Sequence, residues 1–305
     1  MNSHPVYKST HFLAIIACVL WATAFVGIKI GLKYNAPFQF AGIRFFISGL
    51  MILPFIPGFK PTMKVVGKNI GKLILLGFVQ TFLQYALFYK GLSFVPGALG
   101  AMVVGSGPLF IAIVAHFLMP GDTITGKKLL SITVGLVGIA IISIGRKGFG
   151  SAAETAGIGI GIIILIANNI MSGFGNILVA ADKRRIPPLI LSSFSMILGG
   201  AMLFVLGLIT EGYRSGPFPL EYYASLGWLS FLSAAAISIW YTLLKRPGVK
   251  VSELNFWKFI IPVLGAILSW LILPNERPTL IAIVGMVFVA IALVMLNRIG
   301  KSRGI

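Results

Sequence analysis

Two positively charged side chains interrupt long apolar runs of this 305-residue chain. Arg44 and Lys258 each lie well inside a run of about 20 apolar residues, which is long enough to cross a bilayer. A charge within such a run is costly to bury and is a candidate functional group. Lys258 lies four residues before Pro262, whose ring disrupts the hydrogen bond that the Lys258 carbonyl would accept. A cation beside a freed carbonyl could bind a substrate carboxylate.

Both cations also have a structural interpretation. Each lies about 10 Å of helix from the end of its run, so its side chain could extend to the membrane interface. For Arg44 we favour the structural role, with the guanidinium bonded to loop carbonyls. For Lys258 the two interpretations are balanced.

Four other apolar runs carry polar or aromatic side chains at helical spacing. Gln80 and Gln84 are one turn apart, and Asn169 and Ser172 recur in the same way. Amides are costly in lipid unless they face protein or a water-filled cavity. Hydrogen bonds between helices could explain any single stripe, but stripes in four runs are better explained by a central polar cavity.

We therefore predict a substrate cavity inside a bundle of helices. Tyr241, beside Trp240, could equally belong to an aromatic belt at the membrane interface. The predicted substrate contacts are Trp21, Gln80, Gln84, Tyr85, Asn168, Asn169, Ser172, Tyr241 and Lys258.

The acidic residues and the known catalytic motifs limit the possible chemistry. All seven Asp and Glu residues fall in loops or at the ends of apolar runs. Proton-coupled export of organic cations would need a carboxylate within the membrane, so this activity is disfavoured. The segment 121–128 resembles a phosphate-binding loop, but Lys128 stands where its Ser or Thr should be. We expect no metal, no cofactor and no enzymatic activity.

Composition predicts an all-α polytopic membrane protein. The chain is 57% hydrophobic and 10% charged, whereas a soluble protein has about 25% charged residues. The net charge of +18 does not indicate nucleic acid, because most basic residues lie between apolar runs, as in cytoplasmic loops. The ten predicted transmembrane helices are 12–31, 37–57, 71–92, 97–118, 127–145, 157–179, 188–210, 222–245, 252–273 and 278–297.

The distribution of Lys and Arg predicts the orientation in the membrane. If both termini are cytoplasmic, 16 basic residues face the cytoplasm and 7 face outward. Since cytoplasmic loops carry the excess of basic residues, we expect the N-in and C-in arrangement. The predicted loops are short, and the longest are 58–70, 146–156 and 211–221.

An internal repeat divides the chain into halves. Residues 105–125 recur 154 positions later, so that Pro108 aligns with Pro262 and Asp122 with Glu276. Five spans per half make the repeats, 1–150 and 151–305, inverted in the membrane, an arrangement found mainly in transporters. We predict that the two prolines are hinges. For the two acidic residues, Asp122 and Glu276, we expect a structural or gating role.

The order of these features resembles the EamA-type carriers of the drug/metabolite transporter superfamily. The resemblance covers residues 12–298 and includes the opening segment 21–29, Pro37, Arg44 and the paired proline–acid elements. It implies a ten-helix carrier that exports or exchanges small metabolites, often amino acids, without ATP.

The predicted cavity and the resemblance to EamA-type carriers together predict a secondary transporter in the cytoplasmic (inner) membrane. The expected substrates are amino acids or related carboxylates, because the predicted cavity is polar, aromatic and positive. The alternatives are a flippase for lipids or lipid-linked headgroups, and a structural membrane subunit without transport activity. The expected partners are a small-molecule substrate and the lipid bilayer, and internal duplication favours a monomer.

Overall fold

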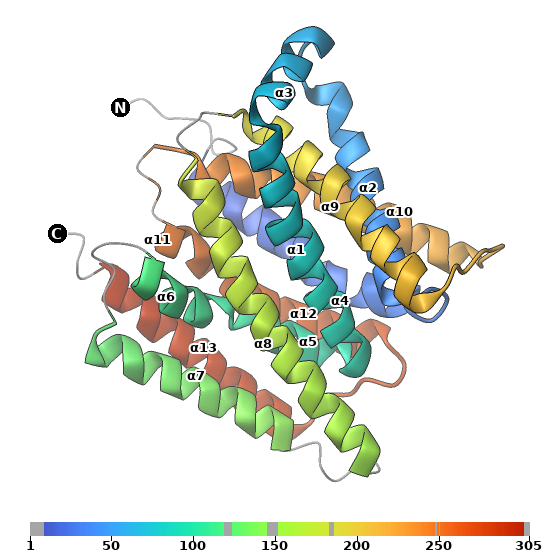
Figure 1. Ribbon diagram of the computed structural model, residues 1–305. Helices are drawn as coiled ribbons and strands as arrows, with labels where there is room; N and C mark the ends of the chain where they lie inside the picture. The colour runs from blue at the N-terminus through green and yellow to red at the C-terminus, as the bar shows by residue number, and fades with distance from the viewer. Residues whose placement is uncertain are drawn as a thin grey trace.

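Apolar helices form almost the entire structure (Figure 1). The computed structural model describes residues 9–118, 124–144, 152–182, 186–247, 249 and 251–301, and no strand occurs in these ranges. The elements are α1 (Thr10–Gly31), α2 (Pro37–Ile52), η2 (Leu53–Phe55), α3 (Phe59–Leu76), η3 (Gly77–Leu83), α4 (Gln84–Phe94), α5 (Gly97–Gly105), α6 (Gly107–Leu118), α7 (Gly126–Ile144), α8 (Ala152–Ala180), α9 (Pro188–Glu211), α10 (Leu220–Leu244), α11 (Val251–Phe256), η4 (Trp257–Phe259), α12 (Ile260–Ile272) and α13 (Leu280–Lys301).

Each predicted span coincides with helical structure. Seven helical segments in the described ranges are long and apolar enough to cross a membrane. The other three predicted spans correspond to α7, α11–α12 and α13, and the apolar helices Ile260–Ile272 and Leu280–Met295 are shorter. A polytopic helical membrane protein is therefore supported, whereas the count of ten crossings and their direction stay predictions.

The predicted loop 58–70 is wrong, because helix α3 begins at Phe59. Helical structure then continues through η3 and α4 to Phe94. The lysines of α3 recur every four residues and so share one helix face, while Thr62 and Val66 are buried. This amphipathic pattern explains why a charged segment is helical. Part of the predicted loop 146–156 is also helical, since α8 begins at Ala152.

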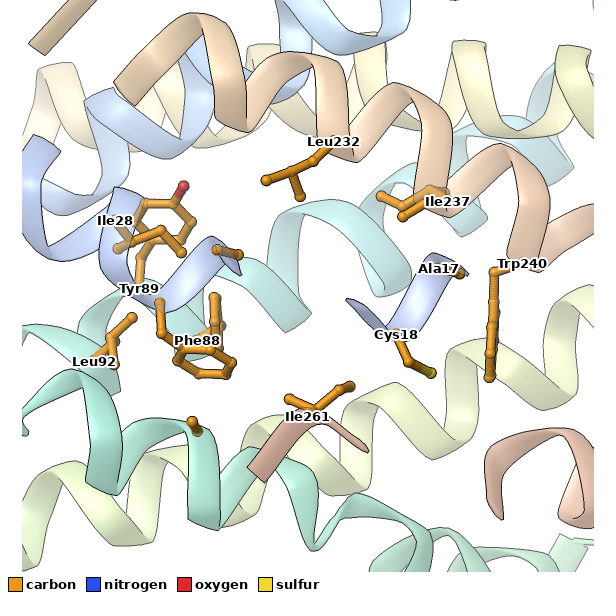
Figure 2. Close-up of a cluster of buried hydrophobic side chains, with 14 of the residues drawn as sticks. Ala17, Cys18, Ile28, Phe88, Tyr89, Leu92, Leu232, Ile237, Trp240 and Ile261 are labelled. Carbon is orange, nitrogen blue, oxygen red and sulfur yellow. The ribbon is translucent and has the colours of Figure 1, made fainter. Parts of the chain in front are cut away.

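Five pairs of helices make the main contacts of the bundle. Helix α1 packs against α10, α2 against α9, α4 against α8, α5 against α12, and α7 against α13. The α7–α13 pair lies at the lower left of Figure 1, apart from α2 and α9. Apolar side chains from α1, α4, α10 and α12 converge inside the bundle (Figure 2). Ala14, Ala17 and Ala22 are buried on α1, and their small size allows neighbouring helices to approach closely.

The two proline-containing spans are interrupted beside Pro108 and Pro262, where the sequence predicts hinges, and a hinge motion stays a prediction. Helix α5 ends at Gly105, before Pro108 in the first turn of α6. Helix α11 gives way to the 3₁₀ segment η4, and Pro262 lies in the first turn of α12. Proline is tolerated in a first turn because its missing N–H would have no partner there. The interruptions touch, since a Cβ on Gly105 would lie 2.2 Å from Cδ of Pro262.

Large apolar side chains cover much of the outer surface. Phe55, Phe59, Leu220 and Leu280 are each at least 75% exposed. Exposed apolar surface on this scale is unusual for a soluble monomer and typical of a surface that contacts lipid.

Candidate functional site

A cavity lies at the centre of the bundle. Its volume is about 90 Å³, which is room for several water molecules at about 10–15 Å³ each. Its lining consists of Trp21, Ala24, Phe25, Arg44, Gln80, Gln84, Tyr85, Phe88, Val104, Gly107, Asn168, Asn169, Ser172, Asn176, Ile237, Trp240, Tyr241, Lys258 and Ile261.

All nine predicted substrate contacts and Arg44 lie on this lining. Segments far apart in the sequence supply them, namely α1, α2, η3, α4, α8, α10 and η4. That these residues bind a substrate remains a prediction. Apolar lining residues such as Val104, Ile237 and Ile261 escape sequence reasoning, because an apolar residue in an apolar run has no distinguishing pattern.

Gln80 lies in a π-helical segment that sequence reasoning did not predict. Residues Gly77–Leu83 form this segment, and Gln84 begins the α-helix that follows. Single π-helical turns inside helices occur frequently at functional sites. Gln80 also packs tightly against α8, where a Cβ on Gly175 would lie 1.3 Å from its Oε1.

The ammonium of Lys258 faces two tryptophan rings. Its Nζ lies 5.0 Å from the ring centroid of Trp240 and 5.7 Å from that of Trp21. The two rings meet edge to face with their centroids 5.0 Å apart. Such rings attract a cation. In the described part of the chain, however, the ammonium makes no hydrogen bond and no ion pair.

Arg44 is the second cation of the lining and is 2% exposed. Its Nε donates to Oγ of Ser233 at 2.9 Å and to the carbonyl of Leu229 at 3.2 Å. Its Nη1 donates to the Tyr89 hydroxyl at 2.7 Å. The expected bonds to loop carbonyls are therefore wrong, because the carbonyl belongs to helix α10 and the guanidinium lies inside the bundle. No carboxylate pairs with Arg44 in the described residues.

Hydrogen bonds set the orientation of the Asn168 amide. Asn169 Nδ2 donates to the carbonyl of Val103 at 2.7 Å, beside the α5–α6 interruption. The Asn169 Oδ1 then accepts from Nδ2 of Asn168 at 3.3 Å. This leaves Asn168 Oδ1 buried without a partner, together with Oε1 of Gln80 and Oε1 of Gln84. Gln80 Oε1 lies against Gly175, so the oxygens of Gln84 and Asn168 are the two unpartnered acceptors that a ligand could satisfy.

A second chain of amides positions Trp240. Its Nε1 donates to Oδ1 of Asn176 at 3.3 Å, and Asn176 Nδ2 donates to Oδ1 of Asn255 at 3.2 Å. Asn255 Nδ2 donates to the carbonyl of Val251 at 2.8 Å. Because the last acceptor is a backbone carbonyl, the sense of each bond is determined. The chain therefore orients the indole that faces Lys258.

The predicted gating acid Glu276 lies away from the cavity lining. Its carboxylate is 7% exposed and accepts from the backbone N–H groups of Gly97, at 2.5 Å, and Ala98, at 2.8 Å. An acidic group at this position satisfies unpaired amides and complements the dipole of helix α5. Its predicted partner Asp122 lies outside the described residues. A gating role for either residue stays a prediction.

Known transporters resemble this chain over most of its length. The uncharacterized transporter YvbV of Bacillus subtilis is 23% identical over 99% of this chain and 96% of its own. A Chlamydia trachomatis protein named an S-adenosylmethionine/S-adenosylhomocysteine transporter is 22% identical over 90% of this chain and 85% of its own. A solved crystal structure of a protein has the same fold, with a TM-score of 0.66 at 18% identity over 98% of this chain and 99% of the other.

The family comparison covers both halves of the chain. The profile described as the EamA-like transporter family matches residues 8–144 and again residues 159–298. Together the two matches include most of the 305 residues. This chain therefore belongs to the EamA-like transporter family.

Proposed function

We propose that this transporter is a secondary carrier that exports amino acids or related carboxylates across the cytoplasmic membrane by alternating access. The observation that supports it best is the Lys258 ammonium, which lines the cavity beside two indoles without an anionic partner in the described residues. Lys258 is half-buried, and a cation held partly out of water without an anionic partner is costly. A substrate carboxylate would offset this cost while bound.

We propose two inverted repeats, 1–150 and 151–305, with ten crossings, which the packing of the helices supports, and both termini cytoplasmic, which the Lys and Arg distribution supports. Suppose that each helix is replaced by its counterpart in the other half. The pairs α2–α9, α5–α12 and α7–α13 are then unchanged, and the pair α1–α10 becomes the pair α8–α4. An arrangement in which helices of one half pack against helices of the other suits a carrier whose site lies between the repeats. Because the duplication supplies both repeats in one chain, we propose that the carrier acts as a monomer.

The name of the Chlamydia relative raises S-adenosyl compounds as a second class of substrate. S-adenosylmethionine carries a sulfonium cation in addition to its amino acid group. The described lining holds two cations and no carboxylate, so it would repel the sulfonium. We therefore propose an uncharged or anionic metabolite rather than this cation.

Flux into proteoliposomes tests the proposed function. Purified full-length protein would be reconstituted and assayed with labelled amino acids, carboxylates, sugars, S-adenosylmethionine and a fluorescent lipid. Saturable flux of amino acids or carboxylates is the expected result. Flux of sugar or lipid alone would overturn the proposal, and lipid movement would support the flippase alternative.

The same assay tests how the charge of Lys258 affects carboxylate flux. Lys258→Gln should lower carboxylate flux about tenfold or more, because a hydrogen bond to a charged group contributes about 1.5–3 kcal/mol. Lys258→Arg keeps the charge and should retain part of the flux. Lys29→Gln is a matched control, since Lys29 donates to the carbonyls of Leu92 and Val95 and is absent from the lining. Equal flux in the wild type and Lys258→Gln would exclude Lys258 from substrate binding.

A further inference from the structure

The two cations of the cavity lining contact helix α10 at separate positions. Arg44 bonds to Ser233, whereas the Lys258 ammonium faces Trp240. These two contact positions on α10 are seven residues apart. At 1.5 Å per residue these contact positions are roughly 10 Å apart along the helix axis, so the two cations contact α10 about two turns apart.

Both cations have donors available for an anionic ligand. Arg44 donates through Nε and Nη1, and its Nη2 has no partner in the described residues. Lys258 uses none of its hydrogen bond donors there. Since no Asp or Glu lies on the described lining, an anionic ligand could neutralise these positive charges, and water can only solvate them.

Amide acceptors provide a third feature of the lining. Gln80 Oε1, Gln84 Oε1 and Asn168 Oδ1 are buried without a partner. The hydrogen bond from Asn169 to Val103 makes the Asn168 oxygen, rather than its nitrogen, the free group. Carbonyl oxygens accept hydrogen bonds and so require an N–H or O–H from the ligand.

We infer that the ligand is a short dicarboxylate that carries an amino or hydroxyl group. One carboxylate binds Arg44, the other binds Lys258, and the amino or hydroxyl group donates to the amide oxygen of Gln84 or Asn168. Contact positions roughly 10 Å apart, with a hydrogen bond of about 3 Å at each end, leave room only for a short ligand. This inference rests on the proposed function and specifies its substrate class.

Equilibrium binding of matched ligands to the purified full-length protein tests this inference. Aspartate and asparagine differ only in one carboxylate, and malate and succinate differ only in one hydroxyl. Aspartate should bind at least about tenfold more tightly than asparagine, and malate about 2- to 10-fold more tightly than succinate. Equal affinities for aspartate and asparagine would overturn the inference. Carboxylate binding without this preference would leave the proposed function standing, whereas no binding of any carboxylate would overturn both.

Charge variants locate the two carboxylate contacts. Lys258→Gln and Arg44→Gln should each reduce the preference for aspartate over asparagine to about twofold or less, and Lys29→Gln should leave it unchanged. Arg44→Lys retains the positive charge and serves if Arg44→Gln does not fold, as judged by thermal unfolding. It should keep part of the preference. A full preference in both Lys258→Gln and the folded Arg44 variant would contradict the two-cation arrangement.

Discussion

At the scale of single residues, the lining holds amides that do not stabilise the folded protein. Gln84 is 8% exposed, and its Oε1 has no partner. A buried acceptor without a partner costs about 1–3 kcal/mol of stability. Such groups occur where a protein gives up stability for function, which supports a ligand contact at this position.

Gln84→Leu should therefore separate stability from binding. The free energy of unfolding should stay unchanged or rise by about 1 kcal/mol, because an unpaired polar group is replaced by an apolar one of similar size. Affinity for the transported carboxylate should fall about 2- to 10-fold. Thermal unfolding and equilibrium binding on the same preparation measure the two effects.

Asn169→Leu is the contrasting variant. It removes the hydrogen bonds to Val103 and Asn168, so both stability and affinity should decrease. A stability loss in Gln84→Leu as large as that in Asn169→Leu would show that Gln84 has a structural role instead.

At the scale of helices, the interruptions in α5–α6 and α11–α12 place backbone and prolines beside the cavity. Lys258 itself lies in η4, four residues before Pro262. An alanine at position 262 would restore an N–H that could bond to the Lys258 carbonyl. The helix could then continue through η4 and displace the ammonium.

Replacing the prolines should slow transport without unfolding the protein. Pro262→Ala and Pro108→Ala are each expected to reduce flux about fivefold or more, at an unchanged or higher unfolding temperature, because a more regular helix resists bending. Pro54→Ala, at an exposed position in η2, is the control. Wild-type flux in both cavity variants would remove the prolines from the proposed hinge mechanism.

The contact between Gly105 and Pro262, where the two interrupted spans meet, leads to a separate prediction about the stability of the fold. A Cβ on Gly105 would meet Cδ of Pro262 at 2.2 Å, so Gly105→Ala should destabilise the fold by about 1–3 kcal/mol. Gly71→Ala is a matched control in helix α3, where a Cβ would meet nothing within 4 Å. It should stabilise the protein by about 0.5–1 kcal/mol. Equal effects of the two substitutions on thermal unfolding would contradict the close contact.

At the scale of the whole molecule, Asp182 connects segments that lie far apart in the sequence. Its carboxylate pairs with Lys72 of α3 and, at 2.6 Å, with Lys245, which follows α10. It also accepts from the backbone N–H of Ile186 at 3.2 Å. Burial opposes the charged form of Asp182, but the hydrogen bonds and charges of Lys245 and Lys72 outweigh burial and lower its pKa.

Asp182→Asn should destabilise the protein at neutral pH and have little effect in acid. Because the folded pKa lies below the unfolded value of about 3.9, the carboxylate stabilises the fold above that value. This contribution is lost as the pH falls through the folded pKa. Breaking the pair should cost about 3 kcal/mol at neutral pH. Thermal unfolding from pH 7 to pH 3 measures the difference, and a difference independent of pH would contradict the assignment.

Local pattern was sufficient to predict much of this protein. Apolar runs predict the helices, and the polar and aromatic stripes together with the charge of Lys258 predict nine of the residues that line the cavity, with Arg44 beside them. Apolar runs and polar stripes are both patterns between residues close together in the sequence. They can therefore be recognised without knowing which helices pack together. The helical part of 58–70 was missed because its charge suggested a loop, although its period of four residues is helical.

Only the tertiary structure decided what depends on contacts between distant segments. It placed the Arg44 guanidinium against α10 and the Lys258 ammonium facing two indoles, and it interrupted both proline-containing spans. It also determined which amide oxygens remain free, because that depends on carbonyls such as Val103 in another helix. Sequence spacing determines which side chains share one helix face, but the partner of a buried polar group is set by the helix packed against that face.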